Sequence, residues 1–181
     1  MRNFIFLLLL SGCFSIEEVI WIKRSENYDL LYRIEMSSFI TQMISEDSIR
    51  EKFQDERAKY IKIETDSLRG IMILEIFYED LSLNELISKD SSLKFYKSKD
   101  YIEFYKLFSL GDKPRDTLTE NLMNFLFEEN YYKLVVISEK EFLKSNADSI
   151  SSNRLVWVFP LRKLYQLEQG DTIKVFFRLK N

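Results

Sequence analysis

Short runs of β-branched and aromatic residues, each closed by a few polar residues, recur along most of this 181-residue chain. Residues 28–36 are the plainest case, because apolar side chains stand at every second position. These are Tyr28, Leu30, Tyr32, Ile34 and Met36. A period of two is typical of a strand with one buried face. A similar run at residues 16–23 comes before it, and the polar residues 24–27 between the two runs predict a β-hairpin.

Further segments are rich in the residues that favour strands. They span residues 60–64, 70–78, 93–97, 101–110, 131–137, 155–159 and 173–179. The segments at 93–97 and 101–110 predict a second hairpin. Residues 71–78 are apolar on both faces, which predicts a central strand covered from two sides.

Three segments follow helical patterns instead. Residues 45–60 are polar with a thin apolar stripe; Ser48 with Glu51 fits a capping box, and Ser45 is an equally good start. Ser82 with Glu85 is a second capping box, which opens a short helix ending near residue 90. The third helix begins near residue 117, where four apolar residues have amphipathic spacing. These are Leu118, Leu122, Phe125 and Leu126.

The order of these segments predicts an α+β fold. We expect an antiparallel sheet of about eight or nine strands, with about three helices packed mainly on one face. Adjacent hairpins, rather than strict alternation of strand and helix, argue against a parallel sheet. With 46% hydrophobic and 30% charged residues the chain can bury a core, and residues 13–181 are expected to form a single domain.

The missing residue types limit the chemistry. There is no histidine, which removes the usual general base and the commonest metal ligand, and Cys13 is the single cysteine. The four glycines are scattered, so no phosphate-binding loop can form, and a net charge of −3 gives no footprint for nucleic acid. We predict no enzymatic activity, no catalytic residue, no metal and no cofactor. Hydrolysis by carboxylates such as Asp47 with Glu51 is a less favoured alternative.

The N-terminus has the layout of a secretory signal. Arg2 precedes an apolar run at residues 4–10, and small residues follow. The segment Leu10-Ser11-Gly12-Cys13 resembles the lipobox of bacterial lipoproteins. This resemblance implies that residues 1–12 are a signal peptide removed before Cys13, and that Cys13 carries a diacylglycerol and an acylated amine, with palmitate-type chains.

The lipobox resemblance also implies a location. We expect the mature protein to be anchored through Cys13 to the extracytoplasmic side of the cell membrane, where two or more acyl chains hold stably. Phe14 rather than aspartate after the cysteine favours the outer membrane if the bacterium has two. Only two residues separate Cys13 from the run at 16–23, so the domain stands off the bilayer by only about 10 Å.

The C-terminal third shows a second resemblance. Ser145-Asn146-Ala147-Asp148, a polar loop, and a strand that contains Trp157 resemble the end of LppM-type envelope lipoproteins. The resemblance implies a curved antiparallel sheet with helices, and recognition of envelope lipids or glycolipids. We expect Asn146 to fix the loop and Trp157 to anchor the core. Two features depart from the family: residues 25–27 lack the expected glycine, and no apolar span follows Leu179.

These observations predict a lipid-anchored, non-enzymatic lipoprotein of the cell envelope that binds a lipid or another apolar ligand near the membrane. The alternative is a protein–protein interaction or assembly module at the membrane surface, without a small ligand. The many aromatic residues could line a cavity, although filling the core is the favoured explanation. Phe176, with Lys174, Arg178 and Lys180 on the same strand face, could contact lipid headgroups, although a solvated or edge strand is favoured. The oligomeric state is left open.

Overall fold

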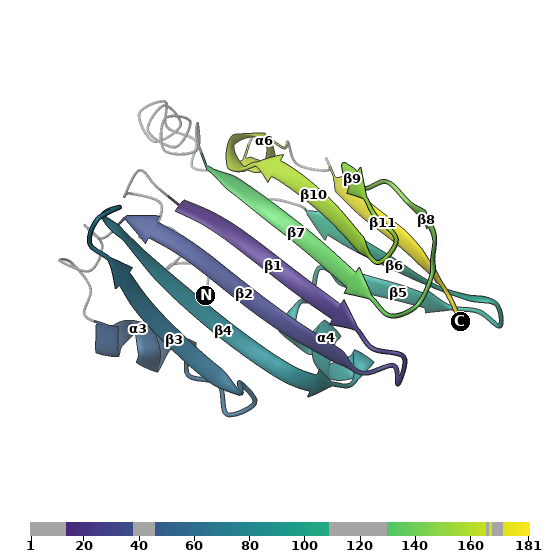
Figure 1. The fold of residues 1–181 in the computed structure, drawn as a ribbon, viewed down its shortest axis with the longest axis horizontal. Helices are drawn as coiled ribbons and strands as arrows, with labels where there is room; N and C mark the ends of the chain where they lie inside the picture. Colours follow the sequence, from purple (N-terminus) through teal and green to yellow (C-terminus); the bar gives the residue numbers. More distant parts are fainter. Residues whose placement is uncertain (1–13, 38–45, 109–129, 166, 168–171) are drawn as a thin grey trace.

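The computed structural model describes residues 14–37, 46–108, 130–165, 167 and 172–181. In these residues two β-sheets face each other across a hydrophobic core (Figure 1). The large sheet has the order β3-β4-β2-β1-β7-β10-β9, and the small sheet has the order β5-β6-β11-β8. Both sheets are open, so the fold is a two-layer arrangement rather than one continuous sheet.

The bounds of the strands agree closely with the runs seen in the sequence. The large sheet contains β1 (Phe14–Ile22), β2 (Tyr28–Ser37), β3 (Tyr60–Asp66), β4 (Ile71–Leu81), β7 (Tyr131–Ser138), β9 (Ser149–Ile150) and β10 (Arg154–Pro160). The small sheet contains β5 (Leu93–Lys97), β6 (Tyr101–Phe108), β8 (Phe142–Ser145) and β11 (Ile173–Lys180). The short strands β8 and β9 were not predicted, because four and two residues are too few to show a strand pattern.

Both predicted hairpins form. β1 pairs antiparallel with β2, and β5 pairs antiparallel with β6. In the first hairpin turn, which contains no glycine, Glu26 takes a left-handed conformation with φ of 63°. The turn closes through a hydrogen bond from the Lys23 amide to the Asn27 carbonyl. A strained glutamate thus takes the left-handed conformation that glycine adopts more easily.

The prediction of a wholly antiparallel sheet is wrong, because β1 and β7 are parallel. β2 occupies one edge of β1, and β7 pairs with the other edge after a long connection from β6. A tight turn fixes an antiparallel direction, whereas a long connection allows either direction. The large sheet is therefore mixed, with one parallel pair at its centre.

The prediction that helices cover the sheet is also corrected. The described helices are short: α3 (Glu46–Phe53), α4 (Leu83–Lys89) and α6 (Leu161–Tyr165). Most of the covering layer is the small sheet. The apolar face of β11 requires an apolar partner, because Val175, Phe177 and Leu179 are all buried. They face the large sheet and do not extend it.

The helix predictions have separate outcomes. α4 begins at the predicted place, because Ser82 caps it and forms the reciprocal capping box with Glu85. α3 lies within the first predicted segment, and its Ile49 reaches the core. The third predicted helix, from residue 117, lies outside the described residues. α6 was not predicted.

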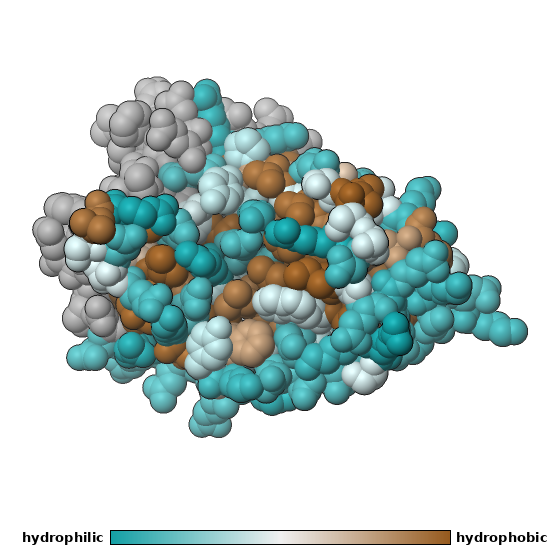
Figure 2. Space-filling view, in the orientation of Figure 1, coloured by the Kyte–Doolittle hydropathy of each residue, from teal (hydrophilic) through white to brown (hydrophobic). Residues whose placement is uncertain are grey.

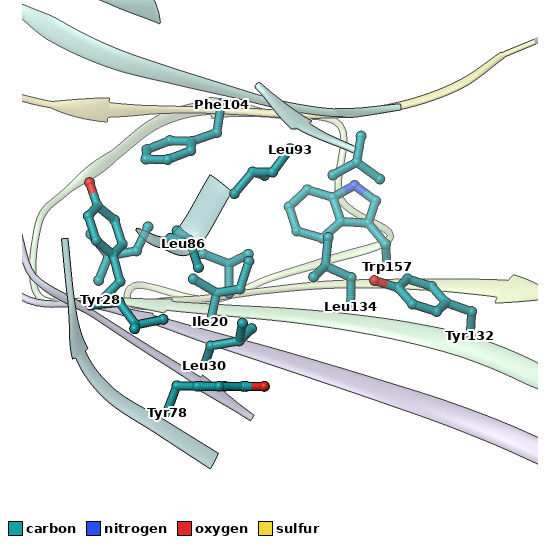
Figure 3. Packing of buried hydrophobic residues seen from close by; sticks show 14 of the residues in the cluster. Ile20, Tyr28, Leu30, Tyr78, Leu86, Leu93, Phe104, Tyr132, Leu134 and Trp157 are labelled. Carbon is teal, nitrogen blue, oxygen red and sulfur yellow. The ribbon is translucent and has the colours of Figure 1, made fainter. Parts of the chain in front are cut away.

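The core lies between the inner faces of the sheets (Figure 3). Phe104 and Leu93 from the small sheet point toward residues of the large sheet such as Ile20, and Leu86 of α4 lies between them. Phe104 stacks on Phe177 with ring centroids 4.9 Å apart. The predicted central strand, β4, is an interior strand, but only its inward side chains are fully buried. Its outward residues are half-buried and lie on the outer face of the large sheet.

Candidate functional site

The outer face of the large sheet has a row of apolar side chains that crosses the strands. Directly paired positions on six neighbouring strands form it, and we call it the apolar row. Its residues are Tyr60, Phe77, Leu31, Val19, Val135 and Val156. Strands lie about 4.8 Å apart, so the row is about 24 Å long. Figure 2 shows hydrophobic side chains across the middle of this face, bordered by hydrophilic ones.

A row of charged residues runs parallel to the apolar row, two positions away on each strand. Positive and negative side chains alternate along it. They are Lys62, Glu75, Arg33, Glu17 and Lys133. Lys133 binds Glu17 at 2.7 Å, and Arg33 lies 3.7 Å from Glu75. Because the signs alternate, the charges neutralise one another and this face has no strong field of one sign.

A groove opens beside the apolar row. It has a volume of about 800 Å³, and Trp21, Phe77 and Ile137 contribute its apolar lining. Trp21 meets Phe77 edge to face at 6.2 Å. These side chains meet because β1 places Trp21 opposite Ile137 of β7, while Phe77 belongs to β4. The volume is within the range of small-molecule sites.

The rim of the groove is polar. The Lys23 ammonium lies 2.8 Å from Asp29 and 2.7 Å from Asp80. Hydrogen bonds to these carboxylates, with that to Asp29 the larger effect, raise the pKa of Lys23. The Arg24 guanidinium is exposed, and its Nε donates a long bond of 3.5 Å to the Glu139 carbonyl. The rim cation with the most free donors is therefore Arg24, next to an apolar surface.

A second cluster of titratable groups is buried between the sheets. It joins Glu18 of β1, Lys106 of β6 and Tyr132 of β7 with Asp90, which follows α4. The Lys106 ammonium lies 2.7 Å from Glu18 and also pairs with Asp90, and the Tyr132 hydroxyl donates to Glu18. Glu18 and Lys106 are 1% and 4% exposed. The cluster therefore links both sheets and the end of α4 through charged hydrogen bonds.

The charges of this cluster are set by opposing effects. Burial raises the pKa of Glu18, and the Lys106 ammonium opposes that shift. The pKa of Asp90 is lowered, because Lys106 and Ser92 outweigh its desolvation. The pKa of Lys106 is raised, because two carboxylates outweigh its burial. Glu18 also has an unsatisfied acceptor, since its buried Oε1 atom has no hydrogen-bond partner.

The buried cluster has catalytic residue types, but substrate has no access to them. Tyr132 is only 7% exposed, so Glu18, Lys106 and Tyr132 are all closed to solvent. Among the described residues, no group of three or more carboxylate, histidine or cysteine side chains could hold a metal ion. The arrangement can fix the two sheets relative to each other. No local sequence pattern points to this cluster, because its members are far apart in the chain.

The two residues expected to be structural have the expected roles. The Asn146 side chain accepts hydrogen bonds from Trp157 Nε1 at 3.1 Å and from the Phe176 amide at 2.8 Å. Its Nδ2 donates to the Lys174 carbonyl at 2.8 Å. Trp157 is 1% exposed and packs against Phe177. Asn146 therefore fixes the loop to β11, and Trp157 anchors the core.

Cys13, the predicted lipidation site, lies outside the described residues. Phe14 immediately begins β1, which agrees with the predicted short connection to the first strand. Phe176 does share a face with the cations of β11, but the edge-strand interpretation is wrong, because β11 lies between β6 and β8. No described helix is long and apolar enough to cross a membrane.

Comparison with known proteins supports the fold. No family model and no curated protein matches the chain. Among solved structures, the chain is similar to the NMR structure of the folded domain of LppM from Mycobacterium tuberculosis. The sequences are 11% identical, the TM-score is 0.59, and the match covers 94% of this chain and 91% of that chain. At this identity the likeness establishes the fold, and it agrees with the resemblance noted at residues 145–159.

Proposed function

We propose that this chain is a lipid-anchored, non-enzymatic lipoprotein of the cell envelope that binds an amphiphilic lipid on the outer face of its large sheet. The groove beside the apolar row is the observation that carries the proposal. It combines an aromatic lining with a polar rim that includes the exposed Arg24, which fits a molecule with an apolar chain and a polar head. The apolar row continues from it over a length comparable with that of an extended acyl chain.

The anchor is the second part of the proposal. Acyl chains on Cys13 would hold the protein on the extracytoplasmic side of the membrane, and on the outer membrane in a bacterium that has two. The fold likeness to the LppM domain and the start of β1 at Phe14 support this location. The closed position of Glu18, Lys106 and Tyr132 supports a role without catalysis.

Ligand binding is tested with the full-length Cys13→Ala chain and a monomeric short-chain phospholipid brominated on its acyl chain. Bromine quenches nearby indoles, and Trp21 lines the groove whereas Trp157 is buried. We expect saturable quenching that Trp21→Phe abolishes. Ile137→Glu should weaken binding at least about tenfold, since it places a charge against the apolar chain.

The matched control is Leu68→Glu, which adds the same charge at a fully exposed position in the turn between β3 and β4. It should bind as the parent chain does. If quenching is absent, or if both variants lose it equally, the groove is not a lipid site. A reproducible cross-linked protein partner on the same face would then favour the assembly-module alternative.

The anchor is tested separately in the native bacterium. Labelled palmitate should enter the wild-type protein and not Cys13→Ala, whose intact mass should be that of the unprocessed precursor. Because this experiment does not involve the groove, the anchor and the ligand site can fail independently. Label incorporated into Cys13→Ala would contradict the lipidation assignment.

A further inference from the structure

We propose that the outer face of the small sheet docks against the anionic lipid headgroups of a membrane. The register places five cations on this face, and we call them the basic face. They are Lys94 of β5, Lys144 of β8, and Lys174, Arg178 and Lys180 of β11. Neighbouring positions on the same face carry Tyr96, Tyr101, Tyr105 and Phe176.

The charge balance of the basic face differs from that of the rest of the molecule. Its one acidic residue among the paired positions is Glu103, which binds Arg178 at 2.5 Å. In the described part of the chain, Lys94, Lys144 and Lys174 form no ion pair, and all three are exposed. The whole chain has a net charge of −3. Positive charge is therefore concentrated on one side of an otherwise acidic protein.

The opposite outer face shows what a balanced surface looks like in this chain. On the large sheet, Lys62 binds Glu64 at 2.7 Å and Lys133 binds Glu17 at 2.7 Å. Cations that are already paired gain little from a negatively charged surface, because the carboxylate beside them is repelled. Unpaired cations do gain, and each contributes to attraction by an anionic leaflet. The small sheet therefore has the surface that fits such a membrane.

The aromatic side chains between the cations suit the same partner. Lys174 Nζ lies 3.8 Å from the centroid of the Tyr105 ring, and the Arg178 guanidinium lies 4.1 Å from that of Tyr101. Tyr105 also packs on Phe176 at 5.5 Å. Tyrosine is enriched at the level of lipid headgroups, where its ring contacts the acyl boundary and its hydroxyl stays hydrated. This face therefore offers positive charge to the lipid phosphates and aromatic rings to the boundary with the acyl chains.

The inference rests on the proposed membrane location, because a basic aromatic sheet could also bind single-stranded nucleic acid. The acyl chains would keep the protein at the membrane, and the basic face would determine which side is turned toward it. The groove, on the large sheet, would then face away from the headgroups that the basic face contacts.

The test uses the full-length Cys13→Ala chain, which carries no acyl group, and measures co-sedimentation with lipid vesicles. One set is phosphatidylcholine, and the other contains about 30% phosphatidylglycerol to supply negative charge. The N-terminal apolar run is common to all variants, and the phosphatidylcholine vesicles report its contribution. Lys94→Gln, Lys144→Gln and Lys174→Gln together should lower the partition coefficient on anionic vesicles about 100-fold, since each cation near such a surface contributes about fivefold.

The matched control removes three positive charges from the outer face of the large sheet: Lys62→Gln, Lys133→Gln and Arg154→Gln. It should stay within about twofold of the parent chain at about 0.1 M salt, where the Debye length is about 10 Å. Equal weakening by both triple variants, or no weakening by the first, would overturn the proposal. Displacement of the vesicles by an equimolar single-stranded oligonucleotide would overturn it in favour of nucleic acid.

Discussion

Glu18 has the most demanding environment of any side chain described here. It is 1% exposed and accepts from Lys106 and Tyr132 through one oxygen, while the other has no partner. Buried ion pairs recover only part of the desolvation that they require, so such a pair is weak support for stability. It does give the two sheets one preferred alignment, because Glu18 and Lys106 must meet.

Glu18→Gln should change the pH dependence of stability. The folded-state pKa of Glu18 is raised by burial, so its proton binds more tightly in the folded state than in the unfolded state, where the pKa is about 4.5. The wild-type protein therefore loses stability from this group as the pH rises from about 4.5 through the folded-state pKa. The glutamine side chain of Glu18→Gln does not titrate. The free energy of unfolding of the wild-type protein minus that of Glu18→Gln should therefore be larger at pH 4.5 than at pH 8.

Urea unfolding of both proteins at the two pH values measures this difference. Titrations shared by both proteins cancel in the comparison. Glu141→Gln, at an exposed position, serves as the control and should change stability by less than about 0.5 kcal/mol at either pH. If the stability of the wild-type protein relative to Glu18→Gln instead increases with pH, Lys106 lowers the pKa of Glu18 by more than burial raises it.

At the scale of elements, the turn between β1 and β2 connects several parts of the fold. Glu26 lies there with φ of 63°, which is costly for a residue with a Cβ atom. Its carboxylate binds Lys97 of β5 at 2.7 Å and Lys140, before β8, at 3.2 Å. These partners, Lys97 first, lower the pKa of Glu26. The side chain thus ties the first hairpin to the small sheet.

The backbone strain at this turn can be separated from the ion pairs. Glu26→Ala and Glu26→Gly both remove the carboxylate, but only glycine tolerates positive φ without a steric cost. We expect Glu26→Gly to be more stable than Glu26→Ala by about 0.5–1 kcal/mol, as measured by urea unfolding. At Ser25, where φ is not positive, the order of the same two substitutions should reverse.

Local sequence patterns predicted the elements well and their long-range pairing poorly. The hairpin at Tyr28 and the capping box at Ser82 depend on neighbouring residues, so they could be read from the chain. The parallel pairing of β1 with β7 depends on two distant segments that carry no mark of each other. The apolar row was missed for the same reason, because each strand supplies only one of its residues.

At the scale of the whole molecule, one core serves both sheets. Phe104 illustrates this, because it stacks on Phe177 in its own sheet and meets Tyr28 of the large sheet edge to face at 6.1 Å. The core cluster includes residues from both sheets and from α4. Separate unfolding of either sheet would expose the inner face of the other, so the two are expected to unfold together.

Phe104→Ala should therefore destabilise both sheets equally. Removing this ring, which is 1% exposed, should cost about 3–5 kcal/mol. Tryptophan fluorescence and far-ultraviolet circular dichroism should shift to the same lower urea midpoint. Tyr96→Ala, at a 58% exposed position, should change stability by less than about 0.5 kcal/mol. Two separated midpoints would show that the sheets are independent units.

The central parallel pair has a consequence for how the protein is made. Tyr132 of β7 follows Glu18 of β1 by 114 residues. At about 5–20 residues per second, synthesis delivers β7 roughly 5–20 s after β1. During that interval a nascent chain holding β1 to β4 leaves the edge of β1 that later pairs with β7 without a partner, and such an edge is a template for aggregation. A chaperone that shields this edge would therefore matter most before residue 138 has been synthesised.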